Sequence, residues 1–219
     1  MTDGSRGGAE VHPAVLTVHL RGIDLDRWHW VPHVWPFGDF DEPRSWADAV
    51  SRRVAKRSRF AFLKRTALRD DLIQLSLSRD GTGTAWSVAY APDLSRPARI
   101  VRITATDSRL GPYRSLESFL QLDQPGLDGV PEIEPFVSPH LGDGVVAVKR
   151  RRAADGTLTA VRSYGWRLQT AYVSIAYADY DLSLMARLQP ELDVLARSLA
   201  FDEVLRGSAA PGDPEAGRS

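Results

Sequence analysis

Alternation of hydrophobic and polar residues predicts most of the strands of this chain. Successive side chains of a strand point to opposite faces, so a period of two indicates a sheet with one buried face. Runs of this kind occur at residues 14–20, 72–78, 85–90, 98–106, 144–152, 158–164 and 166–177. The turns RDGTGT at 79–84 and ADGT at 154–157 carry glycines that suit tight hairpins, so each should join its two flanking strands.

Hydrophobic spacing of three and four residues predicts helices between the strands. The first spans residues 44–57, follows Pro43, and carries Trp46, Val50 and Val54 on one face. Two further segments with this spacing lie at residues 115–122 and 181–199. Each of these helices should pack its apolar stripe against the sheet.

The order of these elements predicts the α+β class, with an antiparallel β-sheet of about six strands flanked by helices. Residues 13–204 are expected to form one domain, in which 124–135 is a loop and Pro190 bends or restarts the last helix. The ends, residues 1–12 and 205–219, are rich in Gly, Pro, Ser and charged residues, so we expect disordered tails there.

The last third of the chain resembles a known fold family. Residues 142–201, from GDGVVAVKRRR to LARSLAF, are similar to the closing half of the PsbP-like α/β/α sandwich superfamily, and SLESFLQ at 115–121 resembles its preceding helix. The resemblance implies an α/β/α sandwich. It also implies a docking, transport or chaperone role without catalytic residues, since members of the superfamily share no reactive group.

Composition narrows the function classes. The chain has no cysteine, which excludes disulfides, thiolate zinc sites and iron–sulfur clusters. It lacks a secretory signal and a membrane-spanning run, so we expect a cytoplasmic protein with no membrane span. The abundance of arginine and alanine is typical of a GC-rich bacterial genome. A formal net charge of zero gives no global attraction to nucleic acid.

The segment RWHWVPHVWPFGDFDE at residues 27–42 is the strongest candidate for binding. It concentrates large aromatic side chains that either cap the core or form a recognition surface. In an extended chain Trp28 and Trp30 point to one side, while His29 and Val31 point to the other. The candidate binding residues are Trp28, Trp30, Trp35, Phe37 and Phe40.

The same segment offers His29 and His33 at a four-residue spacing, which on a helix could hold a metal. Pro32 and Pro36 disfavour such a helix, and the glutamate of the hydrolytic zinc motif is absent, so we expect no metal and no other cofactor. An alternative is a small-molecule or hydrolytic pocket under residues 28–40, with both histidines and Asp39 as its polar groups.

Two basic clusters suggest a second alternative, nucleic-acid binding. Cations between Arg52 and Arg69 follow one another without an acid, and Lys149–Arg152 form a second group. A helix with one apolar face must carry its charge on the solvent side, so solvated surface is the simpler interpretation. We therefore expect a non-enzymatic binding, scaffold or chaperone-like protein that docks a protein or peptide partner, and self-association stays open.

Overall fold

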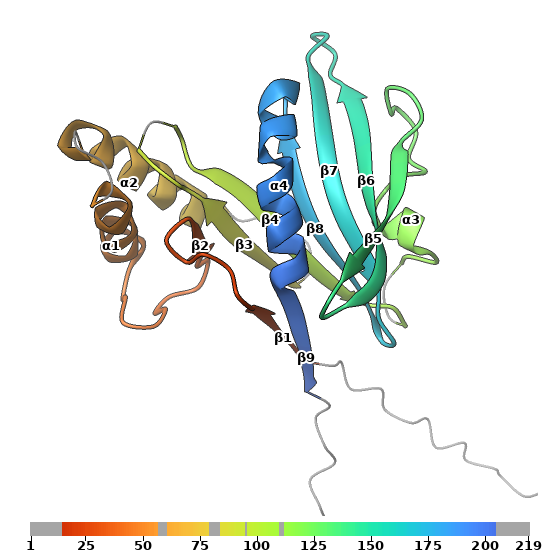
Figure 1. Ribbon diagram of the computed structural model, residues 1–219, viewed down its shortest axis with the longest axis horizontal. Helices are drawn as coiled ribbons and strands as arrows, with labels where there is room; N and C mark the ends of the chain where they lie inside the picture. Colours follow the sequence, from red (N-terminus) through yellow and green to blue (C-terminus); the bar gives the residue numbers. More distant parts are fainter. Residues whose placement is uncertain (1–14, 57–60, 79–83, 95, 110–111, 205–219) are drawn as a thin grey trace, which may run out of the picture.

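The computed structural model describes residues 15–56, 61–78, 84–94, 96–109 and 112–204. Its main feature is a seven-stranded antiparallel sheet in the order β2-β3-β4-β8-β7-β6-β5 (Figure 1). The strands are β2 (Trp28–Val31), β3 (Thr84–Tyr90), β4 (Arg99–Asp107), β5 (Glu132–Ser138), β6 (Gly142–Arg152), β7 (Leu158–Arg167) and β8 (Ala171–Asp179). The predicted tails at 1–12 and 205–219 lie outside the described residues. With its helices, the chain is an α+β protein, as predicted.

One face of the sheet packs against α4 (Leu182–Ser198). Strand alternation sends Val88, Val101, Ile175 and Trp166 to this face, where they form the largest core cluster with the leucines of α4. The helix runs through Pro190 as one element, and the Asp181 carboxylate caps its start by accepting from the Leu184 amide.

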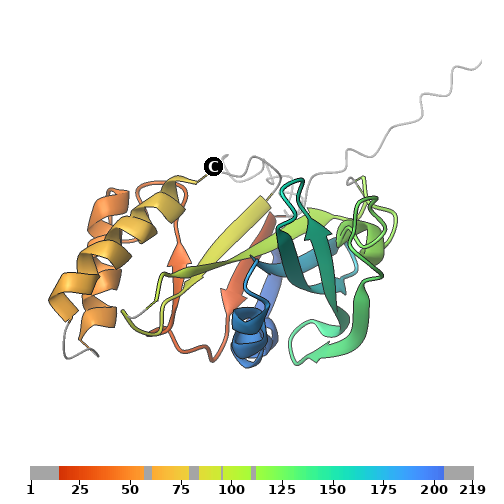
Figure 2. The ribbon, with the colours of Figure 1, turned by 90° about the horizontal axis from the view of Figure 1, so that it is seen from above.

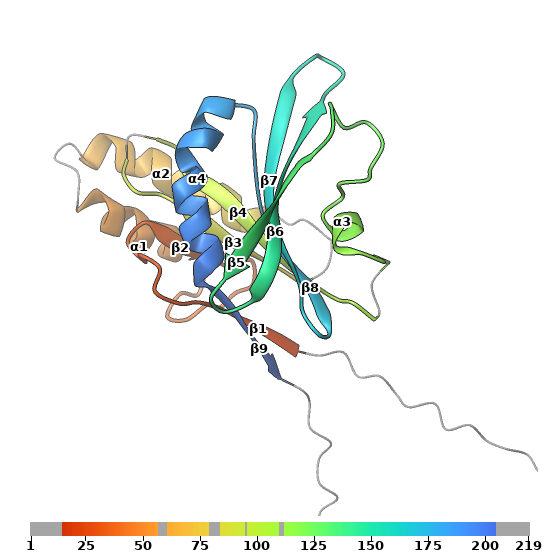
Figure 3. The same cartoon turned by 45° about the vertical axis from the view of Figure 1, so that its right-hand side comes forward.

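The opposite face is covered only at its two ends. At one end, α1 (Pro43–Ala55) and α2 (Ala61–Leu77) pack against β2 and β3 in a second core cluster, to which Val31 and Ala89 belong. At the other end lies the short α3 (Leu116–Phe119), which packs through Phe119 on Ala147 and Tyr172. Figures 2 and 3 show the α1–α2 pair and α3 at opposite ends of the molecule.

A second sheet lies below α4. Its two strands, β1 (Val15–Leu20) and β9 (Leu199–Val204), pair antiparallel and form a ribbon that continues directly from the end of the helix (Figure 1). Phe201 meets the Trp86 ring edge-on at 5.8 Å, so the ribbon is tied to the main core. The described residues thus form seven strands in one sheet and two in another, where about six in one sheet were predicted.

The predicted strand at 72–78 is wrong, because these residues form the end of α2. Leu68, Leu72 and Ser76 recur every fourth residue and are all buried, which is the spacing of one helix face. The hydrophobic residues of a short run can fit both the two-residue period of a strand and the period of a helix, so the run alone does not distinguish the two. The predicted hairpin partner β3 pairs instead with β2 and β4.

Three other boundaries also differ from the prediction. The predicted loop at 124–135 ends early, since β5 begins at Glu132. The predicted strand at 166–177 is two strands, because β7 ends at Arg167 and the chain reverses before β8. The last helix was expected to span residues 181–199, but α4 ends at Ser198, and Leu199–Val204 form β9, a strand that was not predicted. Within the described residues, no helix combines the length and the apolar character needed to cross a membrane.

Candidate functional site

The aromatic segment divides between core and surface. Trp28 is only 2% exposed, Trp30, Trp35 and Phe40 are partly buried, and Phe37 is 41% exposed. The predicted alternation holds in β2, because Trp28 and Trp30 contact the core on the α4 side whereas Val31 joins the core beneath α1 and α2. Most of the five predicted binding residues therefore have a packing role.

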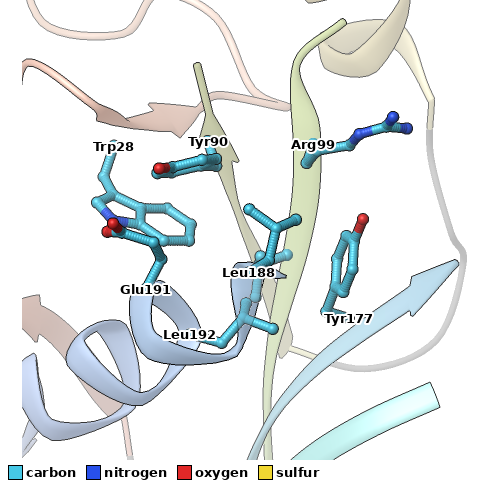
Figure 4. Close-up of a pocket in the computed structure, with 8 residues that line it drawn as sticks. Trp28, Tyr90, Arg99, Tyr177, Leu188, Glu191 and Leu192 are labelled. Atoms are coloured by element: carbon cyan, nitrogen blue, oxygen red, sulfur yellow. The ribbon is translucent and has the colours of Figure 1, made fainter. Parts of the chain in front are cut away.

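Trp28 lies in a packed pocket between the sheet and α4 (Figure 4). Its ring centroid is 4.7 Å from that of Tyr90, and Leu188 and Leu192 of α4 complete the wall. Arg27 ties the two sides together, since it donates to the Tyr90 hydroxyl and lies 2.8 Å from the Glu191 carboxylate. The pocket has no space for a water molecule, so it is a filled part of the core.

A hollow of about 200 Å³ lies on the other side of Trp28, between the aromatic segment and α1; we call it the aromatic hollow. It is lined by the indoles of Trp28, Trp30 and Trp46, with Arg53 at the α1 side. Its other lining residues are Leu25, His29, Phe37, Phe40, Ala49 and Val50. The aromatic hollow lies at the place where the alternative of a small-molecule pocket under residues 28–40 would put its ligand.

The two histidines and Asp39, expected to gather in that hollow, do not all lie there. His29 is buried and lines it, but His33 is turned toward α2 and β3. One His33 ring nitrogen lies 3.2 Å from the Ser76 carbonyl oxygen and the other 2.9 Å from the Ser87 hydroxyl. His33 therefore links three elements, a structural role that the four-residue spacing does not reveal. In the described part of the chain, no three His, Asp or Glu residues are placed to hold a metal.

Part of each basic cluster forms ion pairs with acids. On α1 and α2, Arg52 and Arg65 both pair with Asp48. In the second cluster, Arg150 pairs with Glu132 at 2.8 Å and Arg152 with Asp128 at 2.9 Å. Ion pairs of this kind fit the expectation of a solvated charged surface.

A hollow larger than the aromatic hollow lies over the middle of the sheet; we call it the sheet groove. It has a volume of about 520 Å³ and lies over β4, β8, β7 and β6, with α3 and the segment before it as one wall. The residues that matter for its chemistry are Arg102, Thr104, Lys149, Arg151, Ser163 and Ser174. Nothing in the aromatic segment contributes to it.

The floor of the sheet groove is made of small side chains from paired strands. Ser163 of β7 is paired with Ala176 of β8, and Ser174 of β8 is paired with Gly165 of β7 and with Thr104 of β4. Because these side chains are short, the space above the central strands stays open. Large side chains of the same strands point to the other face, toward α4.

Two floor residues present hydroxyls to this space. Ser163 is 4% exposed and Ser174 is 9% exposed, and both line the groove. A hydroxyl can donate one hydrogen bond and accept others. The floor therefore offers two hydrogen-bonding groups to whatever fills the groove, water or a ligand.

Lys149 stands where the floor meets α3 and is only 9% exposed. Its ammonium group donates to the Leu120 carbonyl at 2.7 Å and lies 3.4 Å from the Gln121 carbonyl. Burial lowers the pKa of Lys149 to about 8, and the nearby Arg151 guanidinium acts in the same direction. The lysine is therefore a cation near neutral pH that becomes neutral in mild alkali.

The chain around Lys149 is held in an unusual conformation. Gln121 has φ of +59°, the left-handed conformation that often ends a helix. Its amide donates to the Ser118 carbonyl at 3.1 Å, and the Leu122 amide donates to Glu117 at 2.9 Å. This turn directs the carbonyl groups of Leu120 and Gln121, which follow α3, toward Lys149. Carbonyl groups at the end of a helix have no partner within the helix, and the ammonium group of Lys149 provides one.

Strand register explains why the sequence did not single out Lys149. The basic run at 149–152 counts as one cluster in the sequence, but alternation places Lys149 and Arg151 on the groove face and the other two arginines on the opposite face. The available signal was the position of this lysine, in phase with the buried Ala147.

Comparison with known proteins adds no family to this geometry. No protein-family model matches the chain, and a search of curated proteins finds no match. What the protein binds therefore has to be inferred from the shape and charge of its own hollows.

Proposed function

We propose that this protein is a non-enzymatic, cytoplasmic binding protein that holds a segment of a partner protein in the sheet groove. The observation that carries the proposal is the pair of buried serines, Ser163 and Ser174, whose hydroxyls open onto a space of about 520 Å³. A peptide backbone has donors and acceptors at regular intervals, so it can satisfy both hydroxyls at once. The chaperone-like role implied by the PsbP-like resemblance is one form of this function.

The environment of Lys149 supports binding over catalysis. A lysine that activates a serine must accept its proton, and the amine must then point at the hydroxyl. The Lys149 amine is directed instead at the carbonyls of Leu120 and Gln121. Its role in the groove is that of a fixed positive charge.

A small molecule in the aromatic hollow is the second candidate. The hollow of about 200 Å³ lies below the size typical of drug-sized ligand sites, but three indoles and Arg53 could hold a flat anionic ring. Nucleic-acid binding has less support, since the arginine clusters that suggested it form ion pairs with acids.

The experiment compares the wild-type chain with Ser174→Trp in a pulldown from the native extract. The indole of this variant should occupy the groove above the floor, where the structure leaves space for it. Val194→Trp is the matched control, because Val194 is exposed on α4, on the other side of the sheet. Circular dichroism should show that both variants stay folded.

We expect one partner to co-purify with the wild type and the control, and to fall at least tenfold with Ser174→Trp. Equal recovery with all three proteins would exclude the groove as the docking site. If Phe37→Ala abolished recovery while Ser174→Trp left it unchanged, the aromatic hollow would be the site instead.

A further inference from the structure

The charge of the sheet groove has one sign. Among the described residues that line it, Lys149, Arg151 and Arg102 are cationic and none is acidic. The remaining polar lining consists of hydroxyls and the amide of Gln121. A chain with a net charge of zero thus carries a locally positive groove, which is what an anionic ligand requires.

The cations stand on two sides of the floor. Lys149 and Arg151 come from β6 and Arg102 comes from β4, with β7 and β8 between them. Three interstrand spacings separate these strands, or roughly 14 Å at about 4.8 Å each. A single carboxylate is too small to meet both sides, whereas an extended segment of about four residues spans this distance at roughly 3.3 Å per residue.

The floor between the cations suits a peptide backbone. Ser163 lies in the same cross-strand row as Arg102, since both are paired with Ala176. Ser174 lies one row further along, next to Thr104. Hydroxyls can both donate and accept, so they can meet N–H or C=O groups of a chain that crosses the strands. Among the lining residues that the structure describes, the only aromatic rings are those of Tyr113 and the buried Phe119, which offer little stacking surface for nucleobases.

We propose that the sheet groove recognises an acidic peptide segment that crosses the strands, with one carboxylate facing Lys149 and Arg151 and a second facing Arg102. The proposal rests on the function proposed above and specifies the chemistry of the partner. Lys149 is held by the end of α3 and supplies a positioned charge, and Arg151, which donates to the Gln124 side-chain oxygen, adds a second charge beside it. Arg102 supplies the positive charge on the other side of the floor.

The test is selection from a display library of random linear peptides on the immobilised full chain. Affinities of selected peptides are then measured by fluorescence anisotropy for the wild type, Arg102→Glu and Arg44→Glu. Arg44 is the matched control, because it is an exposed arginine of α1 that lines neither the sheet groove nor the aromatic hollow. Neither variant changes a buried residue, so loss of folding should not confuse the result.

We expect selected peptides to carry two Asp or Glu residues about three to four positions apart. Arg102→Glu should weaken binding of these peptides at least tenfold at low salt, whereas Arg44→Glu should change their affinity less than twofold. A peptide with lysine at one acidic position should regain affinity for Arg102→Glu. A single-stranded oligonucleotide should not compete.

Three results would overturn the inference in different ways. Peptides that are lost with Ser174→Trp but show no enrichment of acids would contradict the acidic partner and leave the groove as a docking site. Failure to select any peptide that depends on the groove would contradict the proposed function and this inference with it. Displacement by the oligonucleotide would assign the positive groove to nucleic acid and exclude the peptide.

Discussion

Replacing Trp28 with alanine tests whether the aromatic segment serves the core. Trp28 is 2% exposed and packs against Tyr90, Leu188 and Leu192 without space for water. Removing a buried tryptophan costs about 3–5 kcal/mol. We expect the lower end, about 3 kcal/mol, because the aromatic hollow lies beside Trp28 and lets its neighbours relax into the vacated space.

The control is Phe37→Ala, since Phe37 belongs to the same segment but is 41% exposed. Full burial of such a side chain contributes roughly 1.5–3 kcal/mol, so partial burial predicts a loss of about 1 kcal/mol. Urea unfolding followed by far-ultraviolet circular dichroism gives both values, and the melting temperature should fall by roughly 6–12 °C for Trp28→Ala. A loss below 1 kcal/mol for Trp28→Ala with an unchanged m-value would refute its role as a core anchor.

Three further predictions use the same unfolding assay. The pKa of Lys149 in the folded state, about 8, lies below the ordinary 10.5, so the folded protein binds fewer protons than the unfolded chain. The free energy of unfolding should therefore rise by about 2 kcal/mol between pH 8 and pH 10. Lys149→Met should remove this rise, and a rise that persists in the variant would contradict the assignment to Lys149. Gly144→Ala should lower the free energy of unfolding by roughly 2–3 kcal/mol, because the new methyl group would lie 2.5 Å from a backbone carbonyl and from the buried Trp166 ring. Gly165→Ala should lower it by about 1 kcal/mol or less, because the methyl group there meets the flexible ends of leucine side chains. Equal losses of stability in the two variants would refute this distinction. Asp181→Ala removes the cap of α4 and should cost about 1 kcal/mol, whereas Asp181→Asn should retain most of it.

Sequence patterns correctly predicted the elements that are determined by residues close together in the chain. The turn at 154–157 joins β6 and β7 as predicted, with Gly156 at φ of +85° and the Asp155 carboxylate accepting from the Thr157 amide. The helix following Pro43 also forms, because its apolar stripe has a single period. In both cases neighbouring residues carry the whole signal.

Elements that depend on distant partners were not predicted. The β9 strand forms because Leu199–Val204 pairs with β1, about 180 residues earlier in the chain. Nothing within 199–204 distinguishes this strand from a continuation of α4. The run at 72–78 satisfies both a strand and a helix period, and the packing of Leu72 beneath α1 decides between them.

The sheet groove was not predicted, because a hollow forms where no other element covers a surface. The sequence of strand β8 nevertheless indicates that one of its faces is uncovered. A strand in the middle of a sheet covered on both faces is hydrophobic throughout. In β8, Val173, Ile175 and Tyr177 face α4, whereas Ser174 and Ala176 face the groove. Small and polar residues in every second position of a central strand are what an uncovered face requires, because large apolar side chains there would be exposed to water. The small size of Ser174 and Ala176 also keeps the space above the floor open, so one feature of the sequence accounts both for the polar character of this face and for the groove.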